Sequence, residues 1–165
     1  MARIDKKKKL RASILDRLLD NEPENQTEID HGQHHKLKQL RLSVRRDLEN
    51  LLNTRYRVIE APEEFSELEL SLINYGMPDL ATINIVEFEK RKEFTAKLET
   101  ILKQFEPRFK EVNVSYLENK DNTDRTLHFR IDATLYADPA PEVVIFDSVL
   151  EPVTRTVNVE ELSHG

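Results

Sequence analysis

The segment from Gln104 to Phe109, QFEPRF, places an acid and a base on either side of a proline. Pro107 fixes its own backbone dihedral, so we expect Glu106 and Arg108 to lose little conformational entropy when they bind a partner. A guanidinium group held in this way suits a carboxylate, or a row of backbone carbonyls, on another chain. The alternative is a helix end with an exposed acid and base, whose ion pair contributes about 0 to 1 kcal/mol.

Three histidines, His31, His34 and His35, have a spacing that could hold a metal ion. They fall in a stretch that we expect to be a linker, and the chain has no cysteine that could complete a zinc site there. We therefore favour a solvated histidine cluster over a structural zinc site, and we expect neither a metal nor a cofactor. His128 is expected to be exposed on the polar side of a strand.

Other catalytic patterns are not recognisable. The three glycines at positions 32, 76 and 165 are too scattered to form a phosphate-binding loop. No serine lies in a nucleophile elbow. Glycoside hydrolysis needs only two carboxylates about 5 to 10 Å apart, and a chain with 31 acidic residues brings some pair to that distance in any fold. The number of acidic residues is therefore no evidence for glycoside hydrolysis.

The composition indicates one domain with a heavily charged surface. Of the 165 residues, 38% are hydrophobic and 34% are charged, and the mean hydropathy is −0.61. The lack of cysteine is compatible with a reducing compartment. No apolar run follows the basic residues at the start, so we expect a cytoplasmic protein with no signal peptide and no membrane insertion.

Charge is distributed unevenly along the chain. Residues 36–57 hold seven basic and two acidic residues, a net charge of +5, whereas residues 138–165 hold six acidic and one basic residue, a net charge of −5. This split indicates either different partners on different faces or ordinary surface charge. The basic stretch could follow nucleic-acid phosphates, but the pI of about 5.5 and the lack of interleaved arginine and aromatic residues argue against nucleic acid.

Hydrophobic periodicity divides the chain near residue 35. Residues 1–35 are predicted to hold a short amphipathic helix and then a flexible linker over residues 21–33. The apolar side of this helix is formed by Ile14, Leu15, Leu18 and Leu19. Residues 36–165 are predicted to form the main domain.

Two helices are expected at the start of this domain. The first extends from Lys36 and has an apolar stripe with steps of three and four residues, formed by Leu37, Leu40, Val44, Leu48, Leu51 and Leu52. The second covers residues 63–75 and ends at Gly76, which suits a left-handed cap. The alternation over residues 68–72 is also typical of a strand, which is the alternative there.

A third helix is expected to be capped by Asn84 and to end before Pro107, because the residue before a proline is disfavoured in a helix. The period then changes to 2, which indicates strands. They are expected near residues 112–116, 127–135, 143–150 and 153–159. Helices followed by strands predict an α+β fold, with N-terminal helices packed on one antiparallel sheet of about four strands.

Four segments together carry a family signature. Leu42 to Arg55 is similar to RDLExLLNTR, and Ser13 to Leu18 is similar to SLLDRL. Asn74 to Leu80 is similar to YGLPDL, with Met77 in place of the usual leucine. Glu106-Pro107-Arg108 matches a motif shared with the wedge protein of contractile-tailed phages. The chain thereby resembles the TssE family, the sheath-initiator subunits of the type VI secretion baseplate.

The resemblance implies a structural role in the baseplate wedge, beside TssF and TssG, where family members carry the first ring of the contractile sheath. Strands 143–159 would then lie near the sheath contact, and residues 36–165 would be a sheath-initiator-like domain. Seven residues are expected to bind partners: Glu106, Pro107, Arg108, Arg45, Arg46, Asn53 and Arg55.

Our hypothesis from the sequence is a non-enzymatic adaptor without a small-molecule substrate. An antiparallel sheet at the end of a chain offers an edge that can accept a strand of a partner. The family also carries a lysozyme-like label, so peptidoglycan hydrolysis is the alternative. No acid is marked for the apolar pocket that would raise its pKa, as a general acid requires.

Overall fold

The computed structural model describes residues 14–18, 24, 33–55, 64–68, 71–77, 88–119, 126–137, 140–151 and 153–162. The helices within these ranges are α1 (Ile14–Leu18), α2 (Gln33–Asn53), the 3₁₀ helices η1 (Ser66–Leu68) and η2 (Leu72–Asn74), and α3 (Phe88–Phe105). The strands are β1 (Phe109–Leu117), β2 (Leu127–Leu135), β3 (Glu142–Glu151) and β4 (Thr156–Glu161). None of the described helices combines the length and the apolar character needed to cross a membrane.

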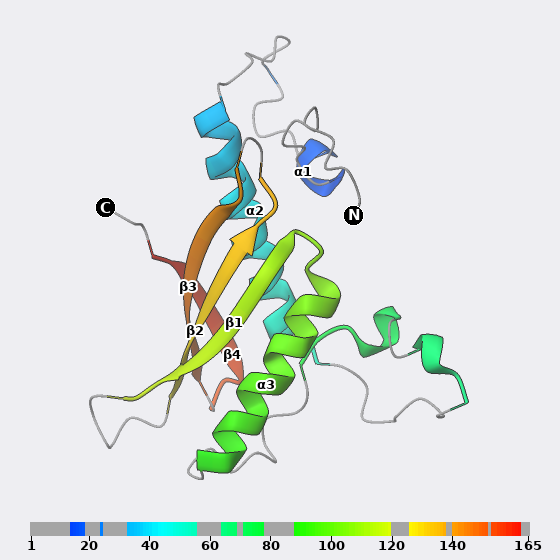
Figure 1. Ribbon diagram of the computed structural model, residues 1–165, viewed down its shortest axis with the longest axis vertical. Helices are drawn as coiled ribbons and strands as arrows, with labels where there is room; N and C mark the ends of the chain where they lie inside the picture. Colours follow the sequence, from blue (N-terminus) through cyan, green and yellow to red (C-terminus); the bar gives the residue numbers. More distant parts are fainter. Residues whose placement is uncertain are drawn as a thin grey trace.

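The four strands form one antiparallel sheet in the order β1-β2-β3-β4, so β1 and β4 are its edges (Figure 1). Helix α3 packs on β1, and helix α2 packs on β4. The predicted α+β class, with helices on one antiparallel sheet of four strands, is confirmed.

The hydrophobic core lies between one face of the sheet and the two long helices. Strand β2 alternates between buried and half-buried positions along its whole length, as expected for a strand with one face in the core. Helix α2 contributes the predicted stripe, of which Leu40, Val44, Leu48, Leu51 and Leu52 are buried. Across the core, the rings of Phe94 and Phe129 meet edge to face with centroids 6.1 Å apart.

Helix α2 begins at Gln33, earlier than predicted, so the backbone of His34 and His35 is helical rather than part of a linker. The side chains of these two residues and all of His31 lie outside the described residues. Most of the predicted linker over 21–33 and the predicted cap at Asn84 also lie outside them. The histidine cluster and the domain boundary therefore stay predictions.

The single helix predicted over residues 63–75 is wrong, because the described part of this segment forms η1 and η2 instead. The hydroxyl of Ser71 donates a hydrogen bond to the carbonyl of Leu68 at 2.7 Å and accepts one from the amide of Ile73 at 3.3 Å. A serine that bonds to nearby backbone groups competes with α-helical hydrogen bonds. Ser71 therefore separates η1 from η2.

Gly76 fixes where this segment meets helix α2. Its φ of 118° is open to glycine, and a Cβ atom there would lie 2.6 Å from the carbonyl oxygen of Thr54. The close approach lets the amide of Met77 donate to that same oxygen at 2.8 Å. The glycine that we predicted as a helix cap thus allows a tertiary contact.

The remaining boundaries mostly agree with the sequence. Helix α3 ends at Phe105, directly before Glu106-Pro107, as predicted. Strand β4 begins at Thr156 rather than at Val153, which lies in the preceding turn and is 90% exposed. Arg155 closes that turn with a φ of 57°, and this left-handed conformation interrupts the strand.

Candidate functional site

Pro107 turns the chain from helix α3 into strand β1. The amide of Glu106 makes the last helical hydrogen bond, to Leu102, and the amide of Phe109 donates to the carbonyl of Glu106 at 3.1 Å. Proline therefore occupies the second position of a four-residue turn, for which its fixed φ is suited. The turn places the side chains of Glu106 and Arg108 beside each other at the corner between α3 and β1.

Arg108 holds the carboxylate of Glu106 with both arms of its guanidinium fork. Nε donates to Oε1 at 2.6 Å, Nη2 donates to Oε2, and the backbone amide of Arg108 donates to Oε1 at 3.1 Å. Only 4% of Glu106 is exposed, so its charge is compensated almost entirely by this one residue. A carboxylate buried to this extent needs such a partner.

Arg108 also reaches across to helix α2. Nη2 donates to Oδ2 of Asp47 at 2.7 Å, and Nη1 donates to the hydroxyl of the buried Ser43 at 3.0 Å. We call Ser43, Asp47, Glu106 and Arg108 the corner network. Because its members come from α2 and from the α3–β1 turn, the network ties two elements that lie about sixty residues apart in sequence.

The electrostatics of the corner network favour the charged form of Arg108. Burial lowers the pKa of Arg108, but hydrogen bonds and Coulomb attraction from Glu106 and Asp47 outweigh it and raise the pKa above its ordinary value. Burial also raises the pKa of the neighbouring Tyr75, as do the charges of Asp47 and Glu106. The Tyr75 ring packs edge to face on Phe105 with centroids 5.3 Å apart.

The expectation that Glu106 and Arg108 are displayed to another chain needs correction. The guanidinium fork is filled by side chains of the same protein, and Glu106 is buried. Pro107 is exposed, and the side chains of Arg108 and Arg46 keep 22% and 34% of their surface. What remains accessible is the outer side of the corner, and a role of these residues in partner binding stays a prediction.

Asn53 and Arg45 contact the outer edge of β4. The side-chain amide of Asn53 donates to the carbonyl of Val157 at 2.9 Å and accepts from its backbone amide at 2.8 Å. Nη1 of Arg45 donates to the carbonyl of Val159 at 3.3 Å. These groups replace part of the hydrogen bonding that a further strand would supply, so helix α2 protects this edge.

Arg55, just after the end of α2, also binds backbone carbonyls of the helix and of the β3–β4 turn. Its Nη1 donates to the carbonyl of Leu52 at 2.8 Å, which satisfies an acceptor in the last helical turn. Its Nη2 donates to the carbonyl of Arg155 in the β3–β4 turn at 2.7 Å. Six of the seven residues predicted to bind partners are thus engaged in contacts within the chain: Glu106, Arg108, Arg45, Arg46, Asn53 and Arg55.

The uneven charge has an explanation within the chain. Arg41 of α2 forms an ion pair with Glu142 of β3 and another with Glu161 of β4 at 3.4 Å. Helix α2 belongs to the basic stretch and packs on β4 of the acidic stretch. Some of the opposite charges therefore pair within the chain.

The first residues of β3 extend beyond the end of its neighbour β4. The β3–β4 register starts at Phe146 and Glu161, and the amide of Leu162 donates to Ile145 at 2.9 Å. Among the described residues, none pairs with residues 142–144 on that side. Residues of an antiparallel strand alternate between its two neighbours, so the backbone of Val143 faces this open edge.

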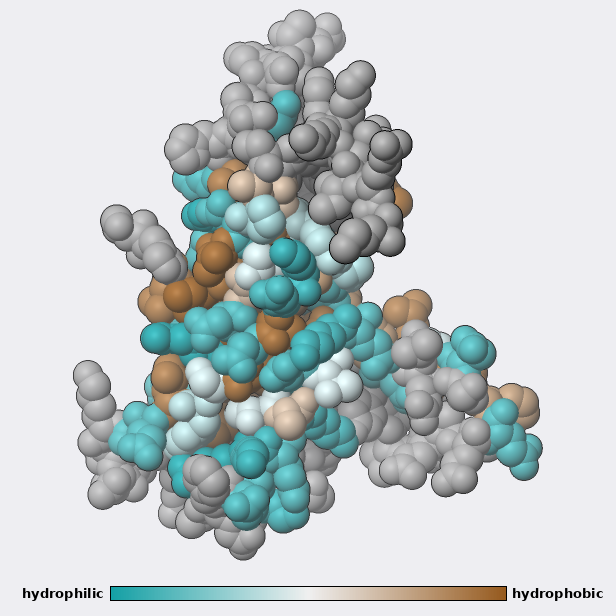
Figure 2. Space-filling model, viewed as in Figure 1, coloured by the Kyte–Doolittle hydropathy of each residue, from teal (hydrophilic) through white to brown (hydrophobic). Residues whose placement is uncertain are grey.

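Exposed apolar side chains lie at the start of β3 and at the adjacent ends of β2 and β4. Tyr136 and Val143 are each 60% exposed, and Leu162 is 38% exposed. With the half-buried Ile145 we call them the β3 patch. Figure 2 shows hydrophobic side chains over β3 and the last residues of β4. Sequence reasoning missed this patch, although apolar residues at both odd and even positions of VVIF were a signal that both faces of β3 meet apolar surroundings.

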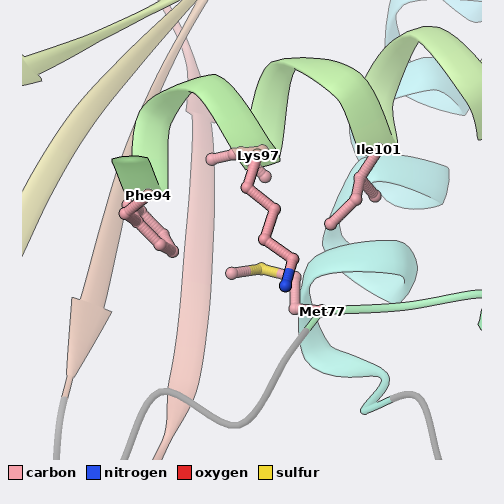
Figure 3. A pocket seen from close by; sticks show the side chains of 5 residues that line it. Met77, Phe94, Lys97 and Ile101 are labelled. Atoms are coloured by element: carbon pink, nitrogen blue, oxygen red, sulfur yellow. The ribbon is translucent and has the colours of Figure 1, made fainter. Parts of the chain in front are cut away.

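Two pockets among the described residues do not resemble a hydrolase site. The first lies between Met77 and α3 and is lined by Phe94, Leu98 and Ile101, with Lys97 as its polar residue (Figure 3). The second, of about 240 Å³, contains Glu142 and Glu161, and both carboxylates are paired with Arg41. A carboxylate paired with a cation differs from a general acid, whose apolar pocket raises its pKa.

Comparison with known proteins places the site in a family context. The family model described as baseplate wedge protein gp25 matches residues 38–140. The matched range includes the whole corner network and ends just before β3. No curated protein matches the chain.

We expect Arg108→Ala to lower the free energy of unfolding by about 3 kcal/mol, because it leaves the carboxylate of Glu106 buried without its cation. Urea denaturation at neutral pH measures the change. Arg46→Ala is the matched control, since its pair with Asp47 at 3.3 Å is partly exposed and contributes less than about 1 kcal/mol. Equal stability of Arg108→Ala and the parent protein would contradict a structural role for the network.

We expect Asn53→Ala to destabilise the protein by about 1 to 2 kcal/mol, because the amide and the carbonyl of Val157 lose their partner. Asn50→Ala, an exposed change on the same helix, should remain within about 0.5 kcal/mol of the parent. Hydrogen exchange of the Val157 amide reports the same contact directly. Unchanged protection in Asn53→Ala would show that Asn53 does not hold the edge of β4.

Proposed function

The chain belongs to the gp25 family of baseplate wedge proteins, and from this premise we propose that it is a TssE subunit of a type VI secretion baseplate. In this role it joins the wedge in the cytoplasm and initiates assembly of the contractile sheath. The four sequence segments that resemble TssE support the finer assignment. The family is mainly structural, which agrees with a protein that binds other proteins.

The open edge of β3 is the observation that supports sheath initiation most directly. An extended segment of a sheath subunit could continue the line of β4 and pair with the backbone of Val143, while its side chains contact the β3 patch. Elsewhere the β4 edge is engaged by Asn53 and Arg45. The remaining gap would therefore direct the incoming strand to one place and one register.

For the wedge partners TssF and TssG we propose the outer side of the corner. Pro107 is exposed there, and Arg108 and Arg46 are partly exposed. The corner network fixes these groups before binding, so little conformational entropy would be lost on association. Glu106, Arg45, Asn53 and Arg55 would act indirectly in this proposal, by holding the corner and the sheet in place.

We expect Val143→Arg to weaken capture of the sheath subunits by about tenfold or more, because it places a charge in the β3 patch. Quantitative pull-down of purified sheath subunits measures the effect. Val153→Arg is the matched control, since Val153 lies in the β3–β4 turn and is 90% exposed.

Capture of TssF and TssG provides the folding control for this experiment. Both variants should retain it, because neither change alters a residue of the corner network. If Val143→Arg and Val153→Arg captured sheath subunits as well as the parent protein, the β3 patch would not be the sheath contact.

The same proposal predicts that the protein does not hydrolyse peptidoglycan. We expect purified protein to release no soluble fragments from peptidoglycan, even at high concentration and over a range of pH. Release that is lost in Glu142→Gln or Glu161→Gln would instead support the lysozyme-like alternative, since these two acids share one pocket.

A further inference from the structure

Residues 64–75, with 69 and 70 outside the described ranges, form an arm that projects from the body of the protein (Figure 1). We call it the acidic arm. Its base is fixed by the contact of Tyr75 with Phe105. Its apolar side chains are exposed, by 57% for Phe65, 82% for Leu72 and 39% for Ile73. Apolar groups clustered on one projection mark an interaction site rather than a part of the core.

The arm lies in an unusually acidic stretch. From Glu60 to Asp79 the sequence holds six acidic residues and no basic one. Glu64 and Glu67 are exposed, and neither forms an ion pair among the described residues. Figure 2 shows hydrophobic and hydrophilic side chains next to each other on the arm. A ligand that suits it must combine apolar side chains with positive charge.

The N-terminal segment of the same chain has this composition. From Arg3 to Leu18 it holds seven basic and two acidic residues, a net charge of +5, including the run Lys6 to Lys9. Helix α1 within it leaves its apolar side chains in solvent, with Ile14 at 79%, Leu15 at 52% and Leu18 at 76% exposure. The two elements are therefore complementary in charge and alike in their uncovered apolar surface.

The chain between them is long enough for this contact. Fourteen residues separate Leu18 from Gln33, and this length spans up to about 50 Å when extended. Helix α2, whose far end carries the base of the arm, is only about 30 Å long. A tethered segment of this kind has an effective concentration on the order of millimolar at its target, which favours contact within one chain.

We propose that the basic segment from Arg3 to Leu18 docks on the acidic arm of its own chain. Ile14, Leu15 and Leu18 cover Phe65, Leu72 and Ile73, and the lysines pair with the glutamates of the arm. This contact is independent of the corner network and of the β3 patch.

The test uses the full chain and a carbodiimide, which joins a lysine amine directly to a carboxylate. Peptide mapping of the monomer band should show Lys6 to Lys9 joined to Glu64, Glu67 or their acidic neighbours. The yield should fall several-fold at about 0.5 M salt, where exposed charges are strongly screened. Leu72→Ser should lower it by about tenfold through the loss of apolar contact.

Val153→Ser is the matched control and should leave the yield unchanged, because it removes an equally exposed apolar side chain elsewhere. Several outcomes would overturn the proposal. These are coupling found only in a dimer band, coupling of these lysines to Glu142 or Glu160 instead, and a yield that responds to neither salt nor Leu72→Ser.

Discussion

The fold depends on one arginine placed between two carboxylates. Arg108 compensates the buried Glu106 and at the same time binds Asp47 and Ser43 of helix α2. Without it, the α3–β1 corner would bury a charge, and helix α2 would lose its polar attachment to that corner. Together with the apolar stripe of α2, the network fixes how this helix lies against the sheet.

Once α2 is fixed, its side chains divide the sheet edge into protected and open parts. Asn53 and Arg45 bind the backbone of β4, whereas the start of β3 has no paired strand on its β4 side among the described residues. Arg41 joins the two parts through its ion pairs with β3 and β4. The proposed docking surface thus lies beside the same helix that stabilises the fold, which suits a subunit on which others assemble.

The sequence allowed most of the fold to be predicted, because apolar periodicity identified the core stripe of α2 and all four strands. It failed where a local hydrogen bond or a tertiary contact decides the structure, as at Ser71, which splits one predicted helix into two turns. The motif around Pro107 was recognised, but its role was not. Arg108 binds Asp47 of helix α2 rather than a partner chain, and no local sequence pattern reveals that pairing.

A double-mutant cycle between Arg108 and Asp47 tests the central claim most directly, because it measures the coupling between α2 and the corner rather than the effect of one deletion. Free energies of unfolding are needed for Arg108→Ala, Asp47→Ala, the double variant and the parent. We expect a coupling of about 1 to 3 kcal/mol. Additive effects, with a coupling below about 0.3 kcal/mol, would show that the network does not join these elements.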